Sequence, residues 1–191
     1  MPTSFVIDPP PSPLPAAAAF LRQARFRLRE DYLVKIILAM KDLSDDQIRW
    51  RPNASSNGIG NLIQHLCGNA RQWIVAGVGG AADTRERAAE FDHPMHVDRD
   101  RLMALLERTL EDVDVILADL ESAVIDTASE SPLQRICTPQ GFAHTVLDAI
   151  FHVVEHFSYH TGQIVMLAKW HAGDRIRLYD DARLNAGTRV P

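Results

Sequence analysis

The stretch LMALLERTLEDVDVILADL, residues 102–120, decides the fold class of this chain. Its apolar side chains recur at intervals of three and four residues, which is the spacing of one face of an α-helix. They are Leu102, Leu105, Leu106, Leu110, Val113, Ile116, Leu117 and Leu120. The pattern predicts a long amphipathic helix over about 97–125 that buries this face against other helices.

Three further segments, 16–43, 58–76 and 142–170, show the same helical spacing of apolar residues. A short turn of helix is expected after Ser44, which stands three residues before Gln47 in a capping-box pattern. No alternating strand pattern of comparable strength is present. We therefore expect an all-α, antiparallel four-helix bundle, whose long connections after the second and third helices leave room for a crossover or a pocket rim.

Composition suggests one domain in three parts: a proline-rich N-terminal arm over 1–15, the helical bundle over 16–171 and a C-terminal tail over 172–191. The net charge of -5 and the lack of a Lys/Arg-rich run argue against a nucleic-acid partner. No signal peptide and no apolar run of about 20 residues is found, so we expect no membrane association and a cytoplasmic location. The two cysteines, Cys67 and Cys137, do not form a disulfide framework or a CxxC pair.

The segment HVVEHFSYHTGQI, residues 152–164, places His152, His156 and His160 four residues apart. Two histidines at this spacing lie about 6 Å apart along a helix and can reach one metal ion. His152 and His160 are separated by about 12 Å along the axis, so the three cannot easily share an ion. A metal would therefore bind one neighbouring pair and take another ligand from elsewhere.

Helical geometry favours the pair His156 and His160, about 100° and 60° from the centre of the buried face, over His152 at about 140°. On the helix expected over 58–76, His65 lies about 90° from the centre, at the margin of the core. His65, His156 and His160 together would make a three-histidine metal site with open positions, whereas structural zinc sites usually have four protein ligands. Imidazole ligands suit Zn, Ni, Cu or Fe.

Other interpretations of these histidines stand beside this one. A single histidine such as His65 is commonly a hydrogen-bonded core or surface residue, and His152 suits a solvated or supporting position. Residues 152–156 also spell H-x-x-E-H, the inverted zinc-protease signature. That signature would require a further carboxylate ligand well downstream, where only the helix end and the tail remain, so we reject it.

Two sequence segments together resemble the DinB-like superfamily of four-helix bundles. They are NLIQHLCGN (61–69), preceded by the loop WRPNASSNGIG (50–60), and HFSYHTGQI (156–164), and the likeness covers roughly residues 20–170. The resemblance implies an up-down-down-up bundle, often a homodimer, with a divalent metal at one end. Its implied ligands are His65, His156 and His160.

The resemblance also implies a class of activity, because several DinB-like proteins are thiol transferases or isomerases that use a low-molecular-weight thiol. We therefore expect a metal-dependent thiol transferase or hydrolase that activates a thiol or water against a small electrophile, with Zn or Ni favoured over Fe or Cu. No catalytic residue is assigned, but Asn69, His152 and Gln163 could support the ligands or contact the substrate. The alternatives are a non-catalytic, metal-stabilised dimerisation or binding protein, and a dimerisation module whose histidines are incidental.

Overall fold

The computed structural model of the chain describes residues 14–92, 98–127, 129 and 131–179. Most of the predicted N-terminal arm and the end of the predicted tail lie outside the described residues. The beginning of the tail packs on the bundle, since Ile176 and Leu178 are buried. No helix in the described ranges combines the length and the apolar character that a membrane crossing requires.

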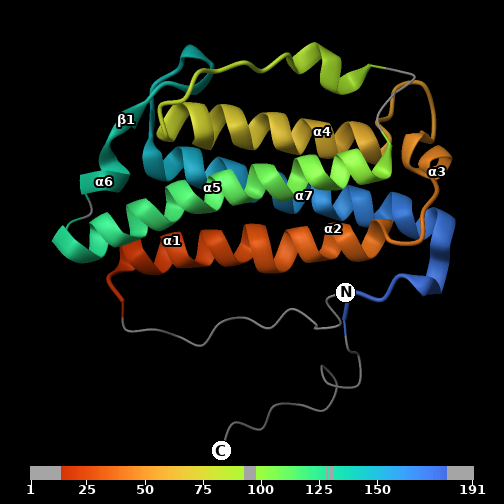
Figure 1. Cartoon of the computed structure of the whole chain (residues 1–191), viewed down its shortest axis with the longest axis horizontal. Helices are drawn as coiled ribbons and strands as arrows, with labels where there is room; N and C mark the ends of the chain where they lie inside the picture. Colours follow the sequence, from red (N-terminus) through yellow and green to blue (C-terminus); the bar gives the residue numbers. More distant parts are fainter. Residues whose placement is uncertain (1–13, 93–97, 128, 130, 180–191) are drawn as a thin grey trace, which may run out of the picture.

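Four long helical segments form the body of the molecule (Figure 1). The first and second each contain a π-helical part, with φ and ψ at the junctions remaining in the α region. The first consists of α1 (Ala16–Phe26), η1 (Arg27–Tyr32) and α2 (Leu33–Met40), the second of α4 (Ile59–Ala70) and η2 (Arg71–Val78), the third of α5 (Arg99–Thr127) and the fourth of α7 (Val146–Ala172). The all-α fold predicted from the sequence is confirmed.

Short elements connect the long helices. The Ser44 side chain caps α3 (Asp45–Arg49) in a capping box with Gln47, as the sequence predicts. The remaining short elements are η3 (Arg87–Phe91), α6 (Ser131–Gln134), η4 (Pro139–Gly141), η5 (Gly173–Arg175) and a two-stranded antiparallel pair of β1 (Ile136–Cys137) with β2 (His144–Thr145).

The fourth long helix begins at Val146, four residues later than predicted. Thr145 is its N-cap: the Thr145 hydroxyl accepts the backbone N–H of Asp148, and the Asp148 carboxylate accepts the backbone N–H of Thr145. Residues 142–145 instead complete the turn and strand before the helix. The apolar spacing continues through Phe142, but the capping box fixes where the helix starts.

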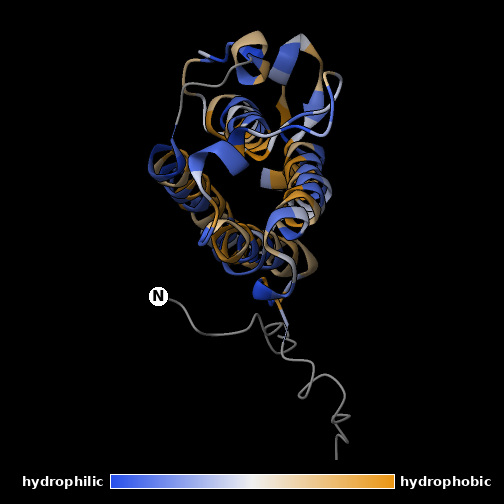
Figure 2. Ribbon diagram, turned by 90° about the vertical axis from the view of Figure 1, so that its right-hand side faces the viewer, coloured by the Kyte–Doolittle hydropathy of each residue, from blue (hydrophilic) through white to orange (hydrophobic). Residues whose placement is uncertain are grey.

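The long helices enclose one apolar core. α5 packs against α1 and α4, and α7 packs against α4 and α2. Viewed along the bundle, the hydrophobic faces point inward from each helix (Figure 2). Leu106, Leu110, Val113 and Leu117 from the stretch that predicted the fold are all fully buried in this core.

The connection between η2 and α5 runs along the length of the bundle above α4, so that α5 begins at the same end as α4 (Figure 1). Its helical turn, η3, contacts α4. The buried Asn61 amide ties the two together, because its Nδ2 donates to the carbonyl oxygens of Glu90 and Asp92 at 3.1 and 3.2 Å. The connection thereby brings charged side chains to the α4 surface.

Candidate metal centre

Three imidazole rings meet between α4 and α7. His65 lies on α4, and His156 and His160 lie one turn apart on α7. One nitrogen from each ring can be chosen so that all three lie within 4.8 Å of one another. The structure thus brings together the three residues predicted as metal ligands, and no other described His, Cys, Asp or Glu joins the group.

The orientation of His65 is fixed by a carboxylate from the connection. His65 Nδ1 lies 2.8 Å from Glu90 Oε2, and both side chains are buried. A carboxylate accepts only, so Nδ1 carries the proton and donates a hydrogen bond to Glu90, which leaves Nε2 free to bind a metal. This carboxylate–histidine pairing is the usual support of a metal-binding imidazole.

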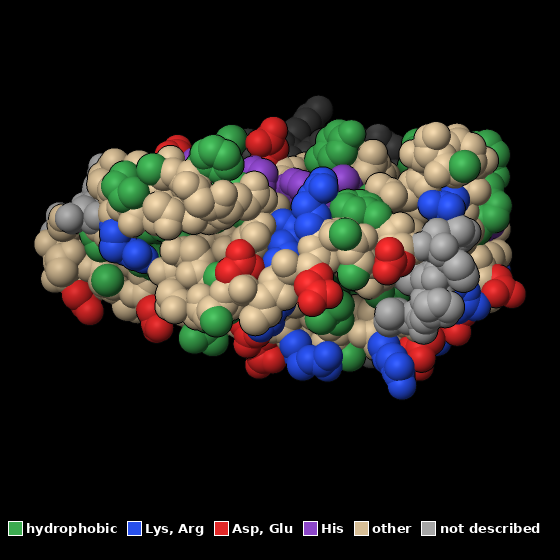
Figure 3. Space-filling view, turned by 90° about the horizontal axis from the view of Figure 1, so that it is seen from above, with side chains coloured by type: hydrophobic (Ala, Val, Ile, Leu, Met, Phe, Trp, Pro, Cys, Tyr) green, Lys and Arg blue, Asp and Glu red, His purple; other side chains and the backbone are tan. Residues whose placement is uncertain are grey.

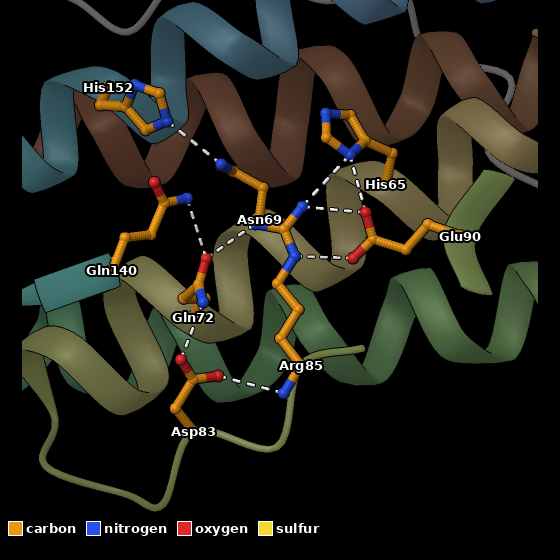
Figure 4. A network of polar contacts seen from close by, with 8 residues as sticks. All are labelled: His65, Asn69, Gln72, Asp83, Arg85, Glu90, Gln140 and His152. Atoms are coloured by element: carbon orange, nitrogen blue, oxygen red, sulfur yellow. Dashed lines mark hydrogen bonds and ion pairs between the residues drawn. The ribbon is translucent and has the colours of Figure 1, made fainter. Parts of the chain in front are cut away.

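Glu90 is in turn held by Arg85 (Figure 4). Arg85 Nε and Nη2 donate to the two Glu90 carboxylate oxygens at 2.6 and 2.9 Å, in a bidentate ion pair whose Arg85 side chain is 4% exposed. Arg85 Nη2 also lies 3.2 Å from His65 Nδ1. Because that nitrogen already donates to Glu90, this contact is a close approach between two donors and contributes no hydrogen bond.

Gly68 makes the space in which this ion pair sits. A Cβ atom added at Gly68 would overlap Glu90 Oε1 and would lie 2.9 Å from Glu90 Cδ and 3.0 Å from Arg85 Nε. Gly68 is in α4, one turn from His65, so the absence of its side chain lets the carboxylate approach the helix. The sequence motif NLIQHLCGN therefore supplies both the histidine and the space for its partner.

The two α7 histidines of the triad, His160 and His156, each leave one ring nitrogen available. His160 Nδ1 lies 2.7 Å from Gln163 Oε1 and donates to it, which leaves Nε2 of His160 available. His156 Nε2 is buried and has no hydrogen-bond partner among the described residues. A buried imidazole nitrogen of this kind, facing two other imidazoles, fits a metal ligand.

The protonation states also suit metal binding. Burial lowers the pKa of His156 to about 3, with the neighbouring His160, His65 and His152 adding to the effect. Burial likewise lowers the pKa of His160 and of His65, although Gln163 and Glu90 respectively oppose the shift. Neutral imidazoles are the form that binds metals, so the donor set fits a divalent transition-metal ion.

His152 lies outside the triad but next to it. Its ring packs against Trp73 with centroids 4.0 Å apart and the planes tilted by 30°, and its Nε2 accepts from Asn69 Nδ2 at 3.1 Å. Burial lowers the pKa of His152. Of the three supporting residues suggested by the sequence, Gln163 hydrogen-bonds to the triad residue His160. The His152 ring lies beside that of His156 with centroids 5.4 Å apart, and Asn69 hydrogen-bonds to His152.

A cavity of about 460 Å³ opens beside the triad. Its wall includes His65 and His156, and it extends past Asn69, Trp73 and His152. From above, histidine side chains lie next to arginine or lysine side chains near the middle of this face of the molecule (Figure 3). A small molecule in the cavity would therefore contact two of the three triad residues.

Comparison with known proteins identifies the family. Residues 15–180 match the family described as Protein of unknown function (DUF1572). The chain belongs to this family. The DUF1572 chain also matches the crystal structure of a DinB-like protein, YjoA, from Bacillus subtilis, with a TM-score of 0.58 and 18% sequence identity over 83% of this chain and 98% of that one. No curated protein matches the sequence.

These comparisons confirm the predicted resemblance to DinB-like proteins and the DinB-like fold of the DUF1572 chain. Within its candidate centre, the sequence did not indicate Glu90, Arg85 or the part played by Gly68. Glu90 and Arg85 lie in an irregular, charged connection that has no periodicity from which a side-chain direction can be predicted. Gly68 lies within the quoted motif NLIQHLCGN, but only the folded connection shows what its missing side chain admits.

Proposed function

We propose that this protein is a divalent-metal-dependent enzyme whose metal ligands are His65, His156 and His160. The observation that carries the proposal is the convergence of three imidazoles beside a cavity, with no fourth described ligand. Three protein ligands leave positions for an exogenous molecule, as in catalytic zinc sites. Imidazole donors suit Zn, Ni, Fe and Cu alike, and of these we propose Zn or Ni.

A divalent ion held by these residues would polarise a thiol or a water molecule and lower its pKa. The protein's own groups orient the ligands: Glu90 and Arg85 set the ring of His65, and Gln163 sets that of His160. The proposed reaction is thiol transfer to, or hydrolysis of, a small electrophilic molecule, with a low-molecular-weight thiol as the co-substrate in the first case.

The cysteines do not offer a competing nucleophile. Cys67 is buried on the α4 face that points toward Thr109 of α5, and burial raises the pKa of its thiol to about 12. Burial also raises the pKa of Cys137. Because the thiolate is the reactive form, neither side chain is prepared for nucleophilic attack.

A second candidate function is a non-catalytic, metal-stabilised homodimer. It is favoured by exposed apolar side chains along α7, where Phe151, Tyr159, Met166 and Trp170 are each more than half exposed. Contiguous exposed apolar surface commonly marks a protein interface. A homodimer is compatible with either function, so the deciding property is whether an added molecule can reach the metal.

The first experiment is elemental mass spectrometry on tag-free protein for the wild type, His65→Ala, His160→Ala and His152→Ala. We expect about one equivalent of transition metal in the wild type and in His152→Ala, and loss of the metal in the two ligand variants. Retention of metal in His65→Ala and His160→Ala would overturn the ligand assignment.

The second experiment separates the enzyme from the non-catalytic dimer. In cobalt(II)-loaded protein, a small added thiol should change the visible absorption if a coordination position is open, and leave it unchanged if the site is closed. His152→Ala serves as the control, because its triad is intact. An unchanged spectrum in a protein that holds one equivalent of cobalt would favour the non-catalytic role.

A further inference from the structure

The side chains that line this cavity are either neutral or positively charged. The described residues that line it comprise three histidines, two arginines, three amide side chains and one tryptophan, and they include no carboxylate. This contrasts with the whole chain, which carries a net charge of -5. Concave sites of one charge sign concentrate ligands of the opposite sign. The wall therefore favours a negatively charged occupant.

Arg87 is the cation best placed to meet such an occupant. The other arginine of the wall, Arg85, is engaged with Glu90, whereas no described carboxylate pairs with Arg87. The Arg87 guanidinium lies 5.2 Å from the centre of the Phe91 ring, and Phe91 packs against His65 with ring centroids 5.0 Å apart. Phe91 thus holds an unpaired cation beside a triad residue.

Trp73 contributes a donor without an acceptor. Its indole nitrogen is buried and has no hydrogen-bond partner among the described residues, and the Trp73 side chain lines the same cavity. The Asn69 carbonyl oxygen, also buried and also on this wall, lacks a donor. Buried polar groups without partners are uncommon in proteins, and an oxygen-bearing ligand would satisfy the indole N–H.

Gln140 completes the wall from η4 with an unfavourable backbone conformation. Its φ is +57°, and no other described residue apart from glycine has a positive φ. The conformation directs the side chain to Gln72, whose Oε1 accepts from Gln140 Nε2 at 3.0 Å and from Arg85 Nη1 at 2.8 Å (Figure 4). Strained residues of this kind concentrate at ligand sites.

We infer that this cavity binds the acid group, a carboxylate or a phosphate, of an anionic small molecule, with Arg87 as the principal contact. The inference rests on the proposed function in that the rest of the molecule would face His65 and His156. Guanidinium groups bind both kinds of oxyanion through paired N–H donors. Trp73, whose buried indole N–H has no partner among the described residues, lies on the same wall.

Calorimetric titration with matched probes tests the inference. Succinate and its neutral analogue succinamide have similar shapes and differ in charge, and inorganic phosphate tests the second oxyanion. The proteins are the wild type, Arg87→Gln and the control Arg101→Gln, which removes the same charge from an exposed arginine on α5. Each protein is titrated both metal-loaded and after chelation, because a carboxylate can also coordinate a metal directly.

We expect the wild type to bind succinate or phosphate and to prefer succinate over succinamide in both metal states. Arg87→Gln should weaken anion binding about tenfold or more, while Arg101→Gln should bind as the wild type does. Equal binding of succinate and succinamide, equal losses in both arginine variants, or no binding of either anion at millimolar concentration would each overturn the inference.

Metal content, measured on the same samples, separates this inference from the proposed function. A wild type that holds no metal but discriminates succinate through Arg87 would retain the anion site and refute the metal-dependent function. A wild type that holds one equivalent of metal but does not discriminate the probes would refute the anion site and leave the metal centre standing. Arg87→Gln should hold the same amount of metal as the wild type in either case, since Arg87 contacts none of the ligand nitrogens.

Discussion

Replacing Gly68 by alanine tests the proposed support of His65 without altering any of the three proposed metal ligands. The new methyl group would occupy the position of Glu90 Oε1, so the carboxylate must move away from α4. The 2.8 Å hydrogen bond from His65 Nδ1 would then be lost or lengthened. Loss of such a partner typically lowers metal affinity about 10- to 100-fold, which corresponds to about 1.4–2.7 kcal/mol.

Gly68→Ala also changes the stability of the fold, and part of this change is favourable. Alanine in place of glycine within a helix stabilises it by about 0.5–1 kcal/mol, which offsets part of the cost of displacing Glu90. Gly68→Ala should therefore remain folded, with a small change in its midpoint of urea unfolding. A fall in metal affinity with little change in stability would distinguish loss of the ligand's support from general damage.

The assay is competition of each protein with a chromogenic chelator for zinc. Gly162→Ala is the matched control, because Gly162 lies in α7, the helix of His156 and His160, and an added Cβ there meets nothing within 4 Å. It should keep the wild-type affinity. Glu90→Ala alone should lower the zinc affinity. The double variant with Gly68→Ala should show little further loss, because both substitutions remove the same interaction between Glu90 and His65. Full zinc affinity in Gly68→Ala, or additive losses in the double variant, would refute the reasoning.

Three more outcomes are expected. Cys67, with its raised pKa and burial, should react with a disulfide reagent at pH 8 only after denaturation, and a fast reaction in the native protein would contradict its placement. Hydrogen bonds from Thr145 lower the pKa of Asp148 in the folded protein below its usual 3.8. The Asp148 carboxylate therefore contributes its full stabilisation above pH 3.8 and loses it as the pH falls through the lower pKa of the folded state. In Asp148→Asn, the thermal unfolding temperature should no longer show this dependence on acid pH. Phe157→Ala should cost about 3–5 kcal/mol in urea unfolding, whereas Phe151→Ala on the exposed face of the same helix should change stability by about 0.5 kcal/mol or less.

Much of the fold follows from sequence because the relevant signals are local. The apolar repeat in 102–120 gives the α5 helix and its buried face, and the Ser44 box gives the start of α3. The later start of α7 had a local signal too, the Thr145 to Asp148 spacing, which the apolar residue Phe142 obscured. Local patterns do not give the order in which helices pack, since that depends on the path of the connections.

Some residues of the candidate site could be predicted from local sequence, and others depend on the path of the folded chain. His156 and His160 could be paired from their spacing, and His65 could be added from its position at the margin of a helix face. Glu90 lies 25 residues from His65 in an irregular segment, and only the folded path of that segment brings them together. Gln140 likewise depends on a backbone conformation that glutamine rarely adopts, so nothing in its local sequence indicates it.

The path of the connection above α4 has a thermodynamic consequence. Glu90 contacts the proposed ligand His65 only while the connection lies against α4, where the Asn61 side chain hydrogen-bonds to its backbone. Metal binding and packing of the connection on α4 are therefore thermodynamically linked. If the packed connection raises the metal affinity by some factor, a bound metal raises the equilibrium constant for packing by the same factor. The segment that carries Arg85 and Arg87 would then be cleaved more slowly by trypsin in the metal-loaded protein than in the metal-free one. The rate of tryptic cleavage in this surface segment would thus report whether the metal site inside the bundle is occupied.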